Sequence, residues 1–210
     1  MRRPRGVIGL APGGVGAGIA AASRFGIHAV MLTDTFKLIL SLNRLRPAPG
    51  QPNRLDGLFA DLRSDRPARP AHEIEDAIWA LWTSHEDAGA AALMERAISL
   101  IGGKKHDAAD HMLTDLVQAQ PLWAEAWNKR ATLYYLMGRD SDSAADIKRT
   151  LELEPRHFGA VCGFAQICLR QGDPQKAVAC FEMALVLNPH LEQVRKIVKH
   201  LSGNLPRTIN

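Results

Sequence analysis

The sequence predicts an all-α protein, a right-handed α-solenoid of about three helix–turn–helix repeats with a helical cap at each end. The first observation is a period: prolines recur at 34-residue intervals, at Pro121, Pro155 and Pro189. The second is a spacing of i, i+4, i+7 for small and apolar residues, which places them on one helix face. This spacing occurs at Leu93, Ala97 and Leu100 and again at Val161, Ala165 and Cys168.

Each repeat is expected to be a pair of antiparallel helices that cannot bury its apolar face alone, so the pairs must stack. Small residues on the first helices, Ala97, Ala131 and Ala165, allow the helices to approach closely. Gly138 and Gly172 suit the tight turns, because a positive φ is cheap only for glycine. The prolines cannot continue the second helices and start the links between repeats. The three units are assigned to residues 90–123, 124–157 and 158–191.

Residues 1–52 differ from the repeats and are interpreted as a leader and linker. The chain opens with MRRPR, and no acidic residue occurs before Asp34. A basic start followed by an uncharged stretch resembles an export signal, and an Arg-, Ala- and Ser-containing segment without acids also resembles an organelle transit peptide. A third interpretation is a true start further along, at Met31. The prolines and glycine of residues 46–53 indicate a linker.

Helices on both sides of the repeats are expected to cap the array. Two amphipathic helices are predicted within residues 53–89, and we expect them to pack on the first repeat; the alternative is a degenerate extra repeat. Their apolar positions are Leu55, Leu58, Phe59 and Leu62, then Ile74, Ile78, Leu81 and Trp82. Residues 192–210 are assigned to a C-terminal capping helix and tail, with an apolar stripe beginning at Leu191.

The charge distribution argues against a nucleic-acid partner. The chain of 210 residues has a net charge of +4, but its 70 N-terminal residues contain 11 Lys or Arg against 4 Asp or Glu. Residues 71–210 contain 15 basic and 18 acidic residues, so the repeats are mildly acidic. Nucleic-acid binding requires a basic stripe on a folded surface.

The sequence contains no recognisable catalytic or metal-binding motif. His106 and His111 lack the spacing of a zinc motif, and the three cysteines, an odd number, cannot all pair within one chain. Cys168 takes a core position, where a buried thiol behaves as a small apolar group. There is also no P-loop, nucleophile elbow or dinucleotide fingerprint. We therefore expect neither an enzyme nor a cofactor or metal site.

The central unit, residues 124–157, carries an aromatic, small and turn pattern at fixed offsets: Trp127, Ala131, Tyr134, Gly138 and Pro155. This pattern resembles the tetratricopeptide repeat (TPR), and the whole chain is similar to short stand-alone bacterial TPR proteins, many of which are exported. The resemblance implies a periplasmic or otherwise exported protein if the leader is an export signal, and a cytoplasmic one if it is not.

The resemblance also implies protein–protein binding, because the first helices of TPR units line a concave groove that holds peptides or partner helices. Tyr135 and Lys129 are the strongest candidates there. Carried over by repeat position, the groove residues are Met94, Ile98, Asn128, Lys129, Thr132, Tyr135, Cys162, Gln166 and Arg170.

Two further expectations concern the partner. Some TPR domains grip the C-terminal carboxylates of chaperones with Lys, Asn and Arg side chains, but the matching positions here are mostly apolar or glycine, so this mode is not expected. These positions are Met94, Ile98, Lys129, Gly159 and Gly163. The preferred interpretation is an adaptor or assembly factor, and the alternative is a membrane-tethered or self-associating spacer protein.

Overall fold

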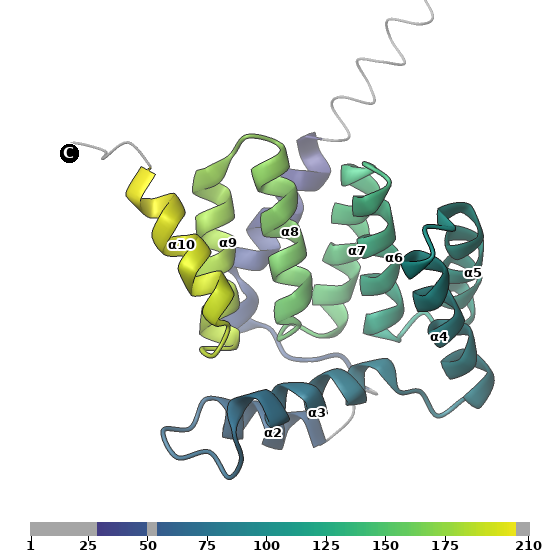
Figure 1. Cartoon of the computed structure of the whole chain (residues 1–210), viewed down its shortest axis with the longest axis horizontal. Coiled ribbons are helices and arrows are strands. Elements are labelled where there is room, and N and C mark those ends of the chain that lie inside the picture. The colour runs from purple at the N-terminus through teal and green to yellow at the C-terminus, as the bar shows by residue number, and fades with distance from the viewer. Residues whose placement is uncertain (1–28, 50–53, 205–210) are drawn as a thin grey trace, which may run out of the picture.

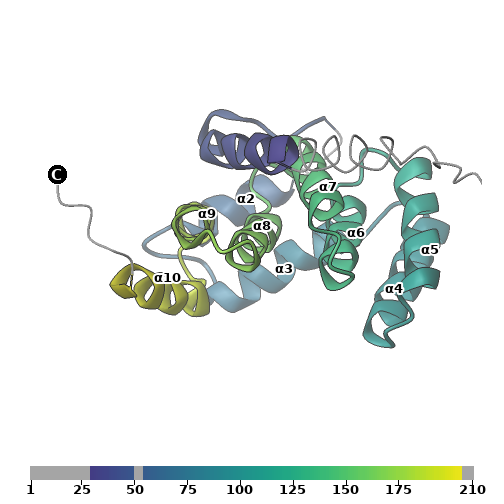
Figure 2. The same cartoon turned by 90° about the horizontal axis from the view of Figure 1, so that it is seen from above.

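The computed structural model describes residues 29–49 and 54–204, and this part of the chain is helical with no strand (Figures 1 and 2). The predicted all-α solenoid is confirmed. Three helix pairs form the array: α4 (Ala88–Gly102) with α5 (His106–Ala119), α6 (Ala124–Leu136) with α7 (Asp140–Leu153), and α8 (Phe158–Arg170) with α9 (Pro174–Leu187). No helix within the described residues is long and apolar enough to cross a membrane.

The turns inside the second and third helix pairs depend on glycine. Gly138 and Gly172 have φ values of +74° and +75°, in the region that side chains with a Cβ rarely adopt. In the first pair Lys104 takes the corresponding place with φ at +56°. A positive φ costs more free energy for lysine than for glycine, so the backbone of the first turn is less favourable than that of the other two.

The buried stripe of α4 lies one helical turn nearer the start of the helix than the expected one. Leu93 is 41% exposed, whereas Met94 is 1% exposed and packs with Ala90 and Ala97 against α5 and α6. In later repeats the residue equivalent to Leu93 packs against a preceding helix, but α4 begins the array. The expected burial of Leu93 is therefore wrong, while the stripe of Val161, Ala165 and Cys168 is buried as expected.

Helices α2 (Arg54–Leu62) and α3 (Ala71–Thr83) cross the ends of the repeat helices (Figure 1). The sequence had suggested that these two helices pack on the first repeat, but they do not. Their aromatic side chains explain the placement: the rings of Phe59, Trp79 and Trp82 all pack on Phe158, with centroids 5.2–6.4 Å away. Aromatic rings bury large apolar areas, and Phe158 lies where the second repeat meets the third.

Part of the segment interpreted as a leader belongs to the folded core. Residues 29–40 form a helix that packs on the second and third repeats. Thr35 and Ile39 are fully buried, and the Thr35 hydroxyl donates to the Ala144 carbonyl at 3.1 Å. The Ala48 amide donates to the Leu153 carbonyl at 2.8 Å. The proposed export signal in residues 1–28 lies outside the described residues.

The C-terminal helix α10 (Glu192–Asn204) packs against α9, where a capping helix was expected. Its apolar stripe is half-buried against the core, and its other face is polar. The stripe consists of Leu191, Val194, Ile197, Val198 and Leu201.

Candidate interaction surface

The first helices of the repeats, α4, α6 and α8, lie on one side of the array, and α5, α7 and α9 lie on the other (Figure 2). We call the side formed by α4, α6 and α8 the first-helix face. It holds the nine residues predicted to contact a partner. The structure distributes these residues between the surface, the core and internal ion pairs.

Seven of the nine predicted residues reach the surface. Ile98, Thr132 and Arg170 are exposed, and Lys129, Tyr135, Cys162 and Gln166 are half-buried. The other two do not: Met94 lies in the core of the first repeat, and Asn128 is buried with its amide Nδ2 donating to Glu125 Oε2 at 2.9 Å. Met94 and Asn128 therefore cannot contact a partner directly in this conformation.

One end of the first-helix face is an aromatic and cationic platform formed by Tyr135 and Arg170. The Arg170 guanidinium lies 3.7 Å from the centroid of the Tyr135 ring, and its Nη1 donates to the Tyr135 carbonyl at 2.9 Å. Arg170 also forms an ion pair with Asp140 at the start of α7. Gln171 donates to the same carboxylate at 2.6 Å. These contacts join α6, α7 and α8 and hold the guanidinium over the ring.

The opposite end of the face contains a buried carboxylate, that of Glu125. Lys129 Nζ lies 2.8 Å from Glu125 Oε1, and His157 Nε2 lies 2.8 Å from Glu125 Oε2. Burial opposes ionisation of this carboxyl, but its hydrogen bond to His157 and the nearby positive charge of Lys129 outweigh burial and lower the pKa of Glu125. Lys129 is thus part of an internal ion pair.

Helix α3 covers this end of the face. Trp79 packs against α8 so closely that a Cβ added to Gly159 would lie 2.6 Å from its Cη2 atom. Lys129 Nζ lies 5.5 Å from the centroid of the Trp79 ring, and Trp82 stacks on the His157 ring with centroids 4.0 Å apart. A segment of the same chain therefore occupies the surface beside Lys129.

No protein-family model matches the chain. A TPR repeat-containing protein of Rhizobium etli is 36% identical to it over 155 residues, which cover 72% of this chain and 76% of the relative. The chain belongs to the TPR protein family. The resemblance that the residues of the central repeat indicated is confirmed by this relationship.

Two solved TPR domains share the fold of this TPR protein. The first TPR domain of Spaghetti (RPAP3), bound to the HSP90 peptide SRMEEVD, superposes with a TM-score of 0.51 and 18% identity over 54% of this chain and 90% of that domain. The Arabidopsis OM64 TPR domain gives a TM-score of 0.52 and 17% identity over 56% of this chain and 97% of that domain. At these identities the likeness concerns the fold.

The sequence patterns did not predict the contact between Trp79 and Gly159. A glycine in the first turn of a helix and a tryptophan on an amphipathic helix are each unremarkable. The two residues are 80 positions apart in the sequence, and only the tertiary structure brings them into contact. The available signal was Gly159 itself, which stands in a helical stretch where glycine costs about 1 kcal/mol relative to alanine.

The cysteines of this TPR protein lie in the third repeat. Cys168 and Cys180 are buried, and Cys162 is half-buried on the first-helix face. Burial raises the pKa of the Cys162 thiol to about 12, so this group is a poor nucleophile at neutral pH. Within the described residues no three His, Cys, Asp or Glu side chains are placed to hold a metal ion.

Proposed function

We propose that this TPR protein is a non-enzymatic protein-interaction module, an adaptor or assembly factor that holds a peptide or helix of a partner on its first-helix face. The TPR fold supports the proposal, and a solved domain of the same fold holds a bound peptide. TPR units present their first helices to such ligands, and side chains there supply both apolar contact and hydrogen bonds.

The observation that carries the proposal is the Tyr135–Arg170 platform. It is fixed by Asp140 and the Tyr135 carbonyl, so a partner would meet a preorganised cation and ring. Thr132 on α6 and Gln166 on α8 are at the surface of the neighbouring helices and offer hydrogen-bonding groups. An extended peptide with a carboxylate or carbonyl directed at Arg170 suits this arrangement.

We place the partner toward the platform and away from Lys129. The Lys129 ammonium is paired with the buried Glu125 carboxylate, and Trp79 of α3 lies beside it. A partner there would have to displace a helix whose inner side chains are buried in the core. At the platform end, Arg170 and Thr132 are exposed in the described structure.

The proposal does not extend to the tails of chaperones. Among the positions that would grip the two carboxylates of such a tail, Ile98 is apolar, and Gly159 and Gly163 carry no side chain. Met94 is buried, and Lys129 is already paired. We therefore propose a partner that lacks this requirement for a double carboxylate clamp.

The experiment is capture of partners from the native cells with the immobilised full chain, followed by mass spectrometry. The double variant Thr132→Arg with Gln166→Arg adds bulk and charge to the face, and we expect at least a tenfold loss of the captured partner. The matched control is Glu182→Arg, an exposed position on α9 at the other side of the array. Circular dichroism should show the same helical content for all three proteins. Undiminished capture by the double variant would place the site elsewhere.

A further inference from the structure

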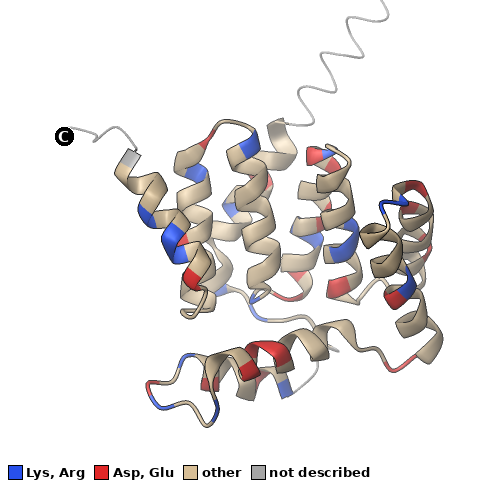
Figure 3. Cartoon of the chain, viewed as in Figure 1, with Lys and Arg blue, Asp and Glu red and all other residues tan. Residues whose placement is uncertain are grey.

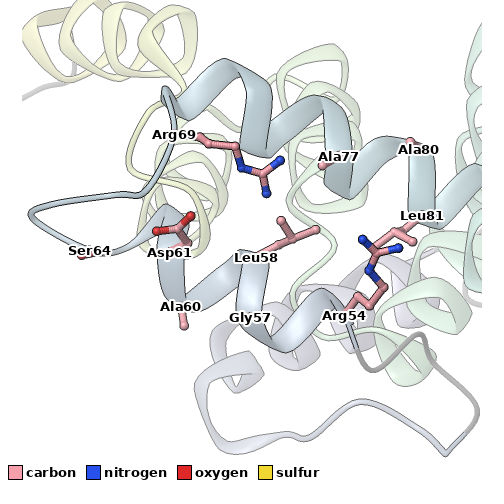
Figure 4. Close-up of a pocket in the computed structure, with 10 residues that line it drawn as sticks. All are labelled: Arg54, Gly57, Leu58, Ala60, Asp61, Ser64, Arg69, Ala77, Ala80 and Leu81. Carbon is pink, nitrogen blue, oxygen red and sulfur yellow. The ribbon is translucent and has the colours of Figure 1, made fainter.

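An open groove runs between α2 and α3 on the side of this helix pair that faces away from the repeats (Figure 4). Its volume is about 830 Å³. Five of its lining residues are glycine, alanine or serine, whose small side chains leave the groove open, and two leucines point into it. We call it the α2–α3 groove. It is lined by Arg54, Gly57, Leu58, Ala60, Asp61, Ser64, Arg69, Ala77, Ala80 and Leu81.

The inner and outer sides of this helix pair are used very differently. The inner side packs on the core, where six large apolar residues are at most 2% exposed: Leu55, Phe59, Leu62, Ile74, Ile78 and Trp82. On the outer side Leu58 and Leu81 remain half-buried, although each is large and apolar. Both leucines also pack partly against the core, and the remainder of each side chain lines the groove, where another helix can contact it.

The charges along α2 have an order that suits pairing with itself. Arg54, Gly57, Leu58 and Asp61 are spaced i, i+3, i+4, i+7 and so form one stripe. The stripe has a cation at its first end, a glycine and a leucine in its middle, and a carboxylate at its last end. Reversing its direction places each charge opposite its counterpart. Figure 3 shows both signs of charge on this helix pair.

The two end groups of the stripe are available. Among the described residues Arg54 has no ion-pair partner, and its guanidinium reaches toward the groove in Figure 4. Asp61 accepts a hydrogen bond from the Ala68 amide through Oδ1 at 2.8 Å, which leaves its second oxygen for another donor. Gly57 has no heavy atom within 4 Å of where its Cβ would be, so another backbone can approach there.

We propose that the α2–α3 groove binds a second copy of this chain, with the two α2 helices antiparallel across a twofold axis. Arg54 would then pair with Asp61 of the partner subunit, and Asp61 with Arg54 of the partner subunit, as an isologous contact requires. Gly57 lies opposite Leu58 of the partner subunit at the crossing point. The groove lies on the far side of α2 and α3 from the repeats. Dimerisation there would therefore leave the first-helix face of each protomer free to bind a partner.

Charge reversal tests this arrangement in the full-length protein. The association constant is measured by sedimentation velocity over a range of concentrations. Arg54→Asp and Asp61→Arg each place like charges together, and we expect each to weaken dimerisation at least tenfold. An equimolar mixture of the two variants restores both ion pairs in a heterodimer, and the double variant Arg54→Asp with Asp61→Arg restores them in a homodimer. Dimerisation in both cases should return to within a few-fold of that of the wild type.

Two further variants keep the test decisive. Lys196→Asp on α10 makes the same charge change away from the groove, and its association should match that of the wild type. Asp61→Arg also removes the hydrogen bond to Ala68, so thermal melting is recorded for every variant. Should Asp61→Arg fold poorly, Ala77→Arg fills the groove without touching that hydrogen bond, and it should abolish dimerisation. A monomeric wild type at 100 µM would overturn the proposal, as would dimers that both reversals leave intact or a mixture that fails to restore association.

Discussion

At the scale of single residues, the buried Glu125 carboxylate is the clearest case of one side chain holding several elements together. It forms an ion pair with Lys129 and accepts a hydrogen bond from Asn128 on its own helix, and it contacts His157 at the start of α8. His157 in turn stacks on Trp82 of α3 and accepts a hydrogen bond from the Ala160 amide. The carboxylate thereby links two repeats to the helix that crosses them.

We predict that Glu125→Gln lowers the free energy of unfolding at pH 7 by about 3 kcal/mol, because it removes one partner from a buried charged cluster. Urea denaturation measures this value. Glu95→Gln on the exposed surface of α4 is the control and should leave the midpoint unchanged.

The same residue predicts a pH dependence. The pKa of Glu125 is lowered in the folded state, so its contribution is fully present above the ordinary glutamate value of 4.5. It is lost as the pH falls below 4.5 and passes through the folded value. The difference in unfolding free energy between the wild type and Glu125→Gln should therefore shrink between pH 5 and pH 3. A difference that stayed constant over this range would contradict the assignment of charge to this carboxyl.

At the scale of elements, the packing of α3 on α8 depends on the absence of one side chain. Gly159 has Trp79 Cη2 at 2.6 Å from its hypothetical Cβ, while Gly163, one turn later in the same helix, has only Ile147 Cδ1 at 3.6 Å. The first distance requires the Trp79 ring to move, whereas the second is an ordinary contact. The two glycines thus form a matched pair in one helix.

We predict that Gly159→Ala destabilises the protein by about 1–3 kcal/mol through overpacking against Trp79. Gly163→Ala should be neutral or stabilise by up to about 1 kcal/mol, because alanine favours the helix interior over glycine. Chemical denaturation compares the two variants. Equal effects of the two substitutions would show that Trp79 does not pack closely on Gly159 in solution.

At the scale of the whole molecule, the segments before the repeats tie the second and third helix pairs into one core. The helix over residues 29–40, α2 and α3 share this core with α7, α8 and α9, whereas the first helix pair has a separate apolar cluster. Leu93 stays exposed because α4 begins the array and the preceding helices pack on the second and third repeats. The segments before the repeats therefore stabilise the second and third repeats more than the first.

A chain that begins at Arg54 should be much less stable than one that begins at Ala29. The shorter chain loses Thr35, Ile39 and Leu42 from the core, and burial of each large apolar side chain contributes about 1.5–3 kcal/mol. We expect a loss of at least about 4 kcal/mol, measured by urea denaturation together with limited proteolysis. Equal stability of the two chains would mean that residues 29–49 are dispensable, as a cleaved leader would be.

The sequence by itself determined the repeats of this protein, because their signals are local. The recurring prolines, the turn glycines and the i, i+4, i+7 spacing each act within one helix pair, and the stripe at Val161, Ala165 and Cys168 is buried as the spacing indicates. The first-helix face was predicted from the resemblance to TPR proteins, and of its residues Arg170 is exposed and Tyr135 is half-buried.

The tertiary structure alone decided how the non-repeated segments are used. Whether Leu93 is buried depends on what precedes α4, and the site where α2 and α3 pack depends on aromatic contacts with Phe158 across about 80 to 100 residues. The pairing of His157 with Glu125 and the covering of Gly159 by Trp79 also arise from long-range packing. Periodicity reports which face of a helix is apolar, but it carries no information on which distant side chains will cover that face.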